Sequence, residues 1–296
     1  MTHGKLGIIG GTGLGDVLIQ EAGGTPISVE TPFGAPSMSP IEARWEGVDV
    51  VFLARHGEGH LLNPTAVPYR ANIWALKKLG VTAIIASGAT GSLREDFEPG
   101  QLVLCDQVID RTYRREGSFF DRGLVAHVEF ADPFCPALRR LLAAAGKSLD
   151  TTVHHAGTYV CMEGPQFSTR AESLMHRQWG GDLIGMTCMP EAKLAREAEI
   201  CYALVAFPTD YDCWRPVAPG RKHEALLAEI LANLRRATDN AVTLLRRTLS
   251  ESIWDQLESD CTCRNALKMA IWSDKARIDP AVRRKLDLLI GRHFEP

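Results

Sequence analysis

Short apolar runs alternate along the chain with longer segments of helical periodicity. Runs rich in apolar and β-branched residues, each followed by glycine or polar residues, predict buried strands at 6–9, 48–54, 81–86, 102–109 and 200–206. Apolar residues at helical spacing predict helices at 72–79, 137–145, 192–198 and 224–249. Strands that alternate with helices in this way are typical of the α/β class.

The end of the chain has a different pattern. From about residue 250 it carries apolar residues such as Trp254, Leu267 and Trp272 in short, helix-like segments. We therefore expect a main domain at 1–249 and a small helical C-terminal extension at 250–296. The apolar residues suggest that this extension docks on the main domain or on a neighbouring subunit.

Composition and charge exclude several classes of protein. The 296 residues are 45% hydrophobic and 23% charged, which is ordinary for a globular protein. The formal net charge is −3 and no block of like charges stands out, so neither a nucleic-acid-binding nor an anionic-membrane surface is expected. No apolar run approaches the roughly 18 residues of a membrane helix, and the first residues lack the pattern of a secretory leader. The sequence therefore predicts a cytoplasmic protein.

Eight cysteines are scattered along the chain, and two of them form the motif Cys261-Thr262-Cys263. This spacing suits a metal-ligand pair, a redox pair or a strained disulfide. A metal site would need a second Cys or His pair nearby, and none is evident from the sequence. We therefore favour structural or incidental thiols, because free cysteine often behaves as a small buried hydrophobic residue. No bound metal is expected.

A glycine-rich loop, Gly10–Gly15, follows the first predicted strand. It is not a dinucleotide fingerprint, because the third required glycine would fall on Asp16. It is not a P-loop either, because no Gly-Lys-Ser/Thr follows. Its backbone N–H groups and the Thr12 hydroxyl could form an anion-binding nest, with a plain turn as the alternative.

Two further strand ends carry groups suited to an anion. Arg55 and His56 follow the second strand, and the planar guanidinium of arginine matches phosphate oxygens. Ser87-Gly88-Ala89 follows the third strand and offers backbone donors. Because open α/β sheets bind ligands beyond the carboxyl ends of their strands, these three ends predict one phosphate site. The alternative is a surface arginine beside a capping histidine.

Two segments suggest recognition of a purine. In the first, 163–168, Phe167 follows a Gly-Pro turn and would stack on a flat ring or else belong to the core. In the second, Asp210 and Asp212 are two residues apart, so in an extended segment both carboxyl groups point to one side. A protonated carboxyl group can donate to N7 of adenine while a carboxylate accepts from its amine. A divalent metal is the alternative, but no further Asp or His cluster completes its shell.

Together these sequence motifs resemble those of the phosphorolytic purine nucleoside phosphorylase family of the trimeric type, over about residues 7–249. Further matching strings are Thr31-Pro32-Phe33-Gly34, Ala71-Asn72-Ile73-Trp74-Ala75-Leu76-Lys77, Gly91-Ser92-Leu93-Arg94, Asp106-Gln107-Val108-Ile109-Asp110-Arg111-Thr112, Pro133-Phe134-Cys135-Pro136 and Met186-Thr187. Within the family, the similarity is greatest to members that act on 5′-methylthioadenosine. It implies a mixed central sheet or distorted barrel flanked by helices. It also implies phosphorolysis to adenine and 5-methylthioribose 1-phosphate, with inorganic phosphate as co-substrate and no cofactor.

The resemblance implies a role for each matching residue. Phosphate would be held by Thr12, Arg55, His56, Gly88, Ala89 and Thr187. Met186 would lie against the ribose, and Phe167 would stack on the base. Asp210 would protonate N7, and Asp212 would recognise the amine. Specificity residues would be Ser168, His223 and His127. The last of these would come from an adjacent subunit, which implies a homotrimer or a hexamer built from trimers.

Two positions depart from the family pattern. Gly88 stands where relatives often place a hydroxyl residue that touches phosphate, so one side-chain contact is lost. His223 stands where enzymes for methylthio nucleosides usually have an apolar residue, whereas enzymes for 5′-hydroxyl nucleosides use histidine. An adenosine-preferring enzyme is therefore the first alternative, with His223 as a plain surface residue at a helix start as the other interpretation. A non-catalytic nucleoside-binding protein is the remote alternative.

Overall fold

The computed structural model describes residues 4–11, 13–216, 220, 222–249, 257 and 261–294, except for the side chains of Asp16, Ala22 and His223. Within these ranges, no helix combines the length and apolar character needed to cross a membrane.

The described residues form an 11-stranded sheet with both parallel and antiparallel pairs. Its strands are β1 (Lys5–Gly10), β2 (Thr25–Pro26), β3 (Ile41–Trp45), β4 (Val48–Ala54), β5 (Val81–Ser92), β6 (Leu102–Leu104), β7 (Gln107–Arg111), β8 (Val153–His154), β9 (Thr158–Met162), β10 (Leu183–Gly185) and β11 (Cys201–Asp210). At the centre, β4, β1, β5 and β11 run parallel to one another. The sheet branches at Gly91, which pairs with both β10 and β11. The predicted mixed α/β sheet is confirmed.

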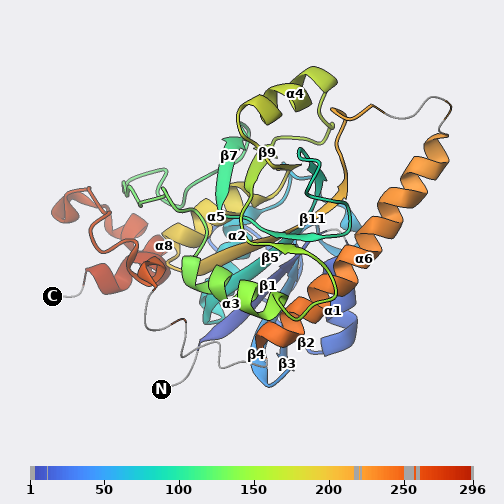
Figure 1. Ribbon diagram of the computed structural model, residues 1–296. Coiled ribbons are helices and arrows are strands. Elements are labelled where there is room, and N and C mark those ends of the chain that lie inside the picture. The colour runs from blue at the N-terminus through green and yellow to red at the C-terminus, as the bar shows by residue number, and fades with distance from the viewer. Residues whose placement is uncertain are drawn as a thin grey trace.

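Helices cover both faces of the sheet (Figure 1). They are α1 (Leu14–Ala22), α2 (Tyr69–Lys78), α3 (Pro136–Gly146), α4 (Arg170–Gln178), α5 (Cys188–Glu197), α6 (His223–Leu249) and α8 (Pro280–Ile290). One core lies under α1, α3 and α6, and a second lies under α2 and α5. Successive side chains of β5 point to opposite faces of the sheet, so this strand contributes to both cores. Ile84 belongs to the second core and Ile85 to the first.

Several element boundaries differ from the sequence prediction. The strand predicted at 81–86 continues to Ser92, because the small residues at 87–91 pair with β11. The strand predicted at 102–109 is two strands, since the Asp106 carboxylate accepts from the Gly157 N–H at 2.8 Å and the chain changes partners there. The helix predicted at 192–198 starts earlier, at Cys188, directly after Thr187.

The C-terminal extension packs against the main body. Leu267, Leu286, Leu289 and Ile290 are buried in the core that lies under α2 and α5. The Leu267 N–H donates to Glu199 Oε1 at 2.9 Å, and Ile271 forms a β-bridge with Ala126. Trp254, which we expected to take part in this packing, lies outside the described residues.

The cysteine motif of the extension has partners that the sequence did not reveal. The expectation that no second cysteine pair lies near Cys261 and Cys263 is wrong. Cys135 immediately precedes α3 and Cys201 begins β11, and the N–H of Cys135 donates to the carbonyl of Tyr202 at 2.7 Å. This contact brings Cys135 and Cys201 to the place where the extension reaches the sheet, so that the four thiols form a cluster.

Candidate active site

Four segments meet where β1 and β4 end, beside the middle of β5. The Gly11 N–H donates to Ser87 Oγ at 3.1 Å, and Arg55 Nη1 donates to the Ser87 carbonyl at 2.8 Å. Thr187 completes the group, because a Cβ placed on Gly88 would lie 3.7 Å from its hydroxyl oxygen. The predicted glycine loop, arginine and small-residue segment are therefore neighbours. Thr12 lies outside the described residues.

Arg55 is held by a residue that the sequence analysis missed. Its guanidinium is fully buried and donates to Glu191 through Nε at 2.7 Å and Nη2 at 2.8 Å. Burial alone would lower the pKa of Arg55, but Glu191 raises it, and the net shift is upward. The nitrogens Nη1 and Nη2 each carry two N–H groups. Within the described part of the chain, only one N–H group of each nitrogen has a hydrogen-bond partner. The two remaining N–H groups are enclosed in this structure, because the side chain of Arg55 is fully buried.

His56, the next residue that we expected to hold phosphate, is adjacent to Arg55. Burial, together with the charge of Arg55, lowers the pKa of His56 to about 4, so the ring is neutral at pH 7. Its Nδ1 lies 2.8 Å from the Leu62 carbonyl, which can only accept, so Nδ1 carries the proton. Nε2 of the neutral ring is then an acceptor, suited to a protonated oxygen of hydrogen phosphate.

The two aspartates lie at the end of β11 in different environments. Asp210 accepts hydrogen bonds from the Thr209 hydroxyl at 3.0 Å and from the Asp212 N–H at 3.1 Å. Burial raises the pKa of Asp210, and the nearby charge of Asp212 adds to the shift. The Ser173 hydroxyl donates to Asp212 Oδ2. One carboxyl group is thus prepared to carry a proton, whereas the other is held as an acceptor.

The prediction that an extended backbone points Asp210 and Asp212 to the same side is wrong. The strand ends at Asp210, and Asp212 lies in a turn with φ 47°. A Cβ placed on Gly91 would lie 3.0 Å from Cβ of Asp212, so the turn packs closely on β5. Glycine at position 91 therefore allows Asp212 to approach the sheet.

The segment 163–168 lies beside this turn. Glu163 does not face a ligand, because Thr65 Oγ1 donates to its carboxylate at 2.5 Å and the Tyr113 N–H donates at 2.7 Å. Phe167 is 85% exposed, which rules out the core alternative within this chain. The Cys213 thiol donates to the Ser168 carbonyl at 3.3 Å and so joins the segment to the Asp212 turn.

Strand register gives the distance between the two halves of the site. Gly88 of β5 pairs with Ala206 of β11, and Gly91 of β5 pairs with Asp210. Three residues of strand span about 10 Å at 3.3 Å per residue. A ribose ring fits between a phosphate at Gly88 and a purine at Asp210.

The remaining predicted residues lie around these two clusters. Met186 immediately precedes Thr187, and its sulfur would be 2.6 Å from a Cβ on Gly164, so it contacts the 163–168 segment. His127 is exposed, and its ring packs edge-on against Trp272 of the extension at 5.2 Å between centroids. Among the described residues, His127 therefore contacts the C-terminal extension and does not contact Asp210. The side chain of His223 lies outside the described residues.

Glu191 and Ser173 were missed for different reasons. Glu191 had a weak signal, because it lies between Pro190 and Ala192 and an acid is rarely buried without a cation. Ser173 had none, since a single serine on a polar helix does not reveal a contact with Asp212.

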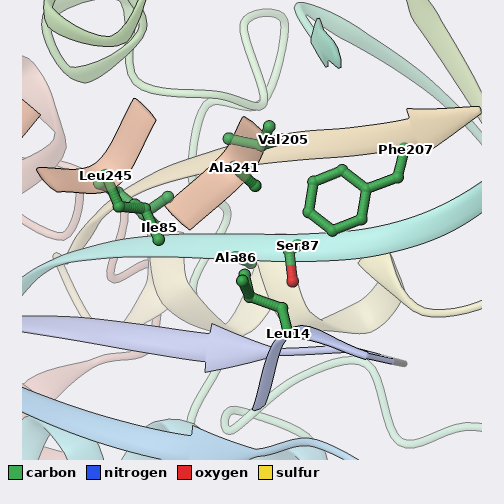
Figure 2. A pocket seen from close by; sticks show the side chains of 8 residues that line it. All are labelled: Leu14, Ile85, Ala86, Ser87, Val205, Phe207, Ala241 and Leu245. Atoms are coloured by element: carbon green, nitrogen blue, oxygen red, sulfur yellow. The ribbon is translucent and has the colours of Figure 1, made fainter. Parts of the chain in front are cut away.

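A small apolar cavity adjoins the Arg55 cluster through Ser87 (Figure 2). It measures about 10 Å³ and is bounded by β5, β11, α1 and α6, with Ser87 as its polar lining residue. Its volume is far below that of a nucleoside, and its apolar walls offer a water few partners. It is a packing defect beneath the sheet and not a ligand site.

A mixed α/β sheet that brings Arg55, Gly88 and Thr187 near Asp210 and Asp212 is the arrangement that the resemblance to the nucleoside phosphorylases implies. Comparison with known proteins places the chain there directly. The chain belongs to the phosphorylase superfamily, whose family model matches residues 5–250.

Individual relatives agree with this membership. A curated S-methyl-5′-thioadenosine phosphorylase of Geobacter sulfurreducens is 49% identical over 290 residues, which cover 97% of this chain and 98% of the relative. The crystal structure of a methylthioadenosine phosphorylase from an antarctic soil metagenomic library superposes with a TM-score of 0.86 at 41% identity, covering 98% of this chain and 99% of that one. Methylthioadenosine phosphorylase from Schistosoma mansoni in complex with adenine gives a TM-score of 0.80 at 35% identity, covering 90% of this chain and 99% of that one.

Proposed function

We propose that the protein catalyses the phosphorolysis of 5′-methylthioadenosine to adenine and 5-methylthioribose 1-phosphate. The observation that carries the proposal is the pairing of β5 with β11, which sets the Arg55 cluster and Asp210 one ribose apart. The names of the relatives support the methylthio nucleoside as substrate.

The proposed reaction starts with stretching of the glycosidic bond. Positive charge then develops on the sugar, where phosphate held by Arg55, Gly88, Ala89 and Thr187 stabilises it and attacks the anomeric carbon. Negative charge develops on the purine, and Asp210 donates its proton to N7 so that adenine leaves neutral. Burial of Asp210 favours the protonated form that this step needs. The chemical step needs no metal or organic cofactor.

Asp212 would read the 6-amino group. Ser173 holds the Asp212 carboxylate as an acceptor, which suits an amine donor and not the carbonyl of a 6-oxopurine. We expect Asp212→Asn to reduce the preference for 5′-methylthioadenosine over 5′-methylthioinosine by at least about tenfold, the value of one hydrogen bond to a charged group.

The ratio of kcat/KM for the two nucleosides measures this effect. Asp49→Asn serves as a control, since Asp49 forms an exposed ion pair with Arg44 between β3 and β4. An unchanged ratio in Asp212→Asn would remove Asp212 as the amine reader.

Assembly and location form part of the same proposal. We infer a homotrimer, or a hexamer of trimers, in which exposed His127 reaches the 5′ end of the nucleoside bound by a neighbouring subunit. The exposure of Phe167 supports a site that is completed by ligand and partner. We also infer a cytoplasmic location.

An adenosine phosphorylase is the second candidate, favoured by His223. A related structure from Schistosoma mansoni, 35% identical, is named an adenosine/methylthioadenosine phosphorylase. If His223 contacts a 5′-hydroxyl group, His223→Val should raise the ratio of kcat/KM for 5′-methylthioadenosine over adenosine by about 10-fold or more, by removing one polar contact and adding apolar surface. Measuring this ratio for parent and variant decides the point, and an equal ratio would leave His223 as a surface residue.

Release of free base from three nucleosides tests the proposed function. With phosphate present, we expect adenine to be released fastest from 5′-methylthioadenosine, more slowly from adenosine, and hypoxanthine from inosine slowest. Faster release from adenosine would favour the second candidate. Binding of adenine without release from any nucleoside would favour a non-catalytic binding protein.

A further inference from the structure

Four cysteines from distant parts of the chain meet at one point, away from the candidate active site. Cys135 precedes α3, Cys201 begins β11, and Cys261 and Cys263 belong to the C-terminal extension. All four Sγ atoms lie within 4.8 Å of one another. Cys135, Cys201 and Cys263 are buried, and Cys261 is half-buried, so an ion can reach the group from the side of Cys261.

The arrangement suits a shared metal better than two disulfides. Sγ of Cys261 lies 3.0 Å from that of Cys201 and 3.4 Å from that of Cys135, so two partners compete for one thiol. A disulfide satisfies only one of them. A tetrahedral metal with bonds of about 2.3 Å to sulfur separates its ligands by about 3.8 Å and satisfies all four at once.

The surroundings of the four thiols are apolar. Buried apolar residues surround the site, among them Leu138, Ala203 and Leu257, so a bound metal would be shielded from water.

We propose that Cys135, Cys201, Cys261 and Cys263 form a tetrahedral structural site for zinc. Four thiolates without an open position are typical of structural zinc and not of catalytic zinc. The ion would fasten the extension to the main sheet, because two ligands come from each. This proposal revises the expectation of no metal, which rested on the apparent lack of a second cysteine pair. It does not depend on the proposed reaction.

The site also connects to His127. Beyond Cys263, the extension contacts the loop that carries His127, whose N–H donates to the Ala270 carbonyl at 2.9 Å. The Trp272 N–H donates to the Val125 carbonyl at 3.0 Å on the same loop. Losing the ion would therefore loosen the support of this loop, while the contacts of Arg55 and Asp210 would remain.

Metal content and thiol count of the full-length protein test the proposal. Purified without chelator, the protein should contain about one zinc per chain by elemental analysis. After denaturation with chelator, all eight cysteines should react with a thiol reagent. Replacement of zinc by cobalt should give the visible absorption of a tetrahedral tetrathiolate complex. No metal with about four reactive thiols would indicate two disulfides and overturn the proposal, and no metal with eight would indicate free thiols and overturn it as well.

A matched pair of variants locates the ion. The double substitution of Cys261 and Cys263 by serine should abolish the cobalt absorption and lower the thermal midpoint, with base release retained at low temperature. Cys105→Ala is the control, because Cys105 is a buried cysteine directly after β6 that lies outside the cluster, and it should keep full metal content. Undiminished metal in the double variant would contradict the assignment even if both proteins are equally stable.

Discussion

Replacing Asp210 by asparagine should lower kcat for 5′-methylthioadenosine by about 10²–10⁴-fold, the usual contribution of a general acid, with little change in KM. Asparagine keeps the shape and can accept one of the two hydrogen bonds from Thr209 and Asp212, but it has no proton to transfer to N7. Steady-state kinetics at saturating phosphate measure the loss.

Two controls distinguish proton transfer from simple damage to the site. A nucleoside already methylated at N7 carries its positive charge before the reaction, so its cleavage should be nearly unaffected in Asp210→Asn. Because burial raises the pKa of Asp210 above its usual value of about 4, wild-type kcat should fall as pH rises through that raised pKa. This alkaline limb should be absent from the variant. Equal losses for both substrates would contradict the acid role.

Replacing Glu191 by glutamine should lower the free energy of unfolding by about 3–5 kcal/mol, the usual cost of leaving a buried charge without its partner. Both side chains are almost completely inaccessible, and Glu191 also accepts from the Tyr202 hydroxyl at 2.8 Å. Urea denaturation measures the effect. Phosphate should recover more stability in the variant than in the wild type, because the anion would offset the unpaired charge of Arg55.

Glu42→Gln is the matched control for this loss. Glu42 pairs with Lys5 at 2.5 Å, but about a third of each side chain is exposed. Such pairs contribute about 1 kcal/mol or less, because water and salt screen them. Similar losses of unfolding free energy in the two variants would show that the buried Arg55–Glu191 pair stabilises the protein no more than an exposed pair does.

Local pattern was sufficient to predict the α/β fold and the strand ends that carry the site. The strands that end at Arg55 and Asp210 are apolar and β-branched, so periodicity identified them and their polar ends. The strand at 81–92 was cut short, because the glycines in its second half have low strand propensity and only pairing with β11 holds them extended. The short strand β9 and helix α4 were not predicted.

Contacts between distant residues account for most of what the sequence left open. Glu191 lies 136 residues from Arg55, and Ser173 lies 39 residues from Asp212. The cysteine cluster joins positions 126 residues apart, so the Cys261 motif looked incomplete when considered alone. The division of the chain at residue 249 and the roles of the individual site residues stay predictions.

The identity of the sugar product tests the central claim most directly. Incubated with 5′-methylthioadenosine and inorganic phosphate, the protein should convert the phosphorus resonance of phosphate into that of a sugar 1-phosphate, in equal amount to the adenine released. Without phosphate, no adenine should appear. Release of adenine with free 5-methylthioribose, at a rate independent of phosphate, would show a hydrolase and contradict the account.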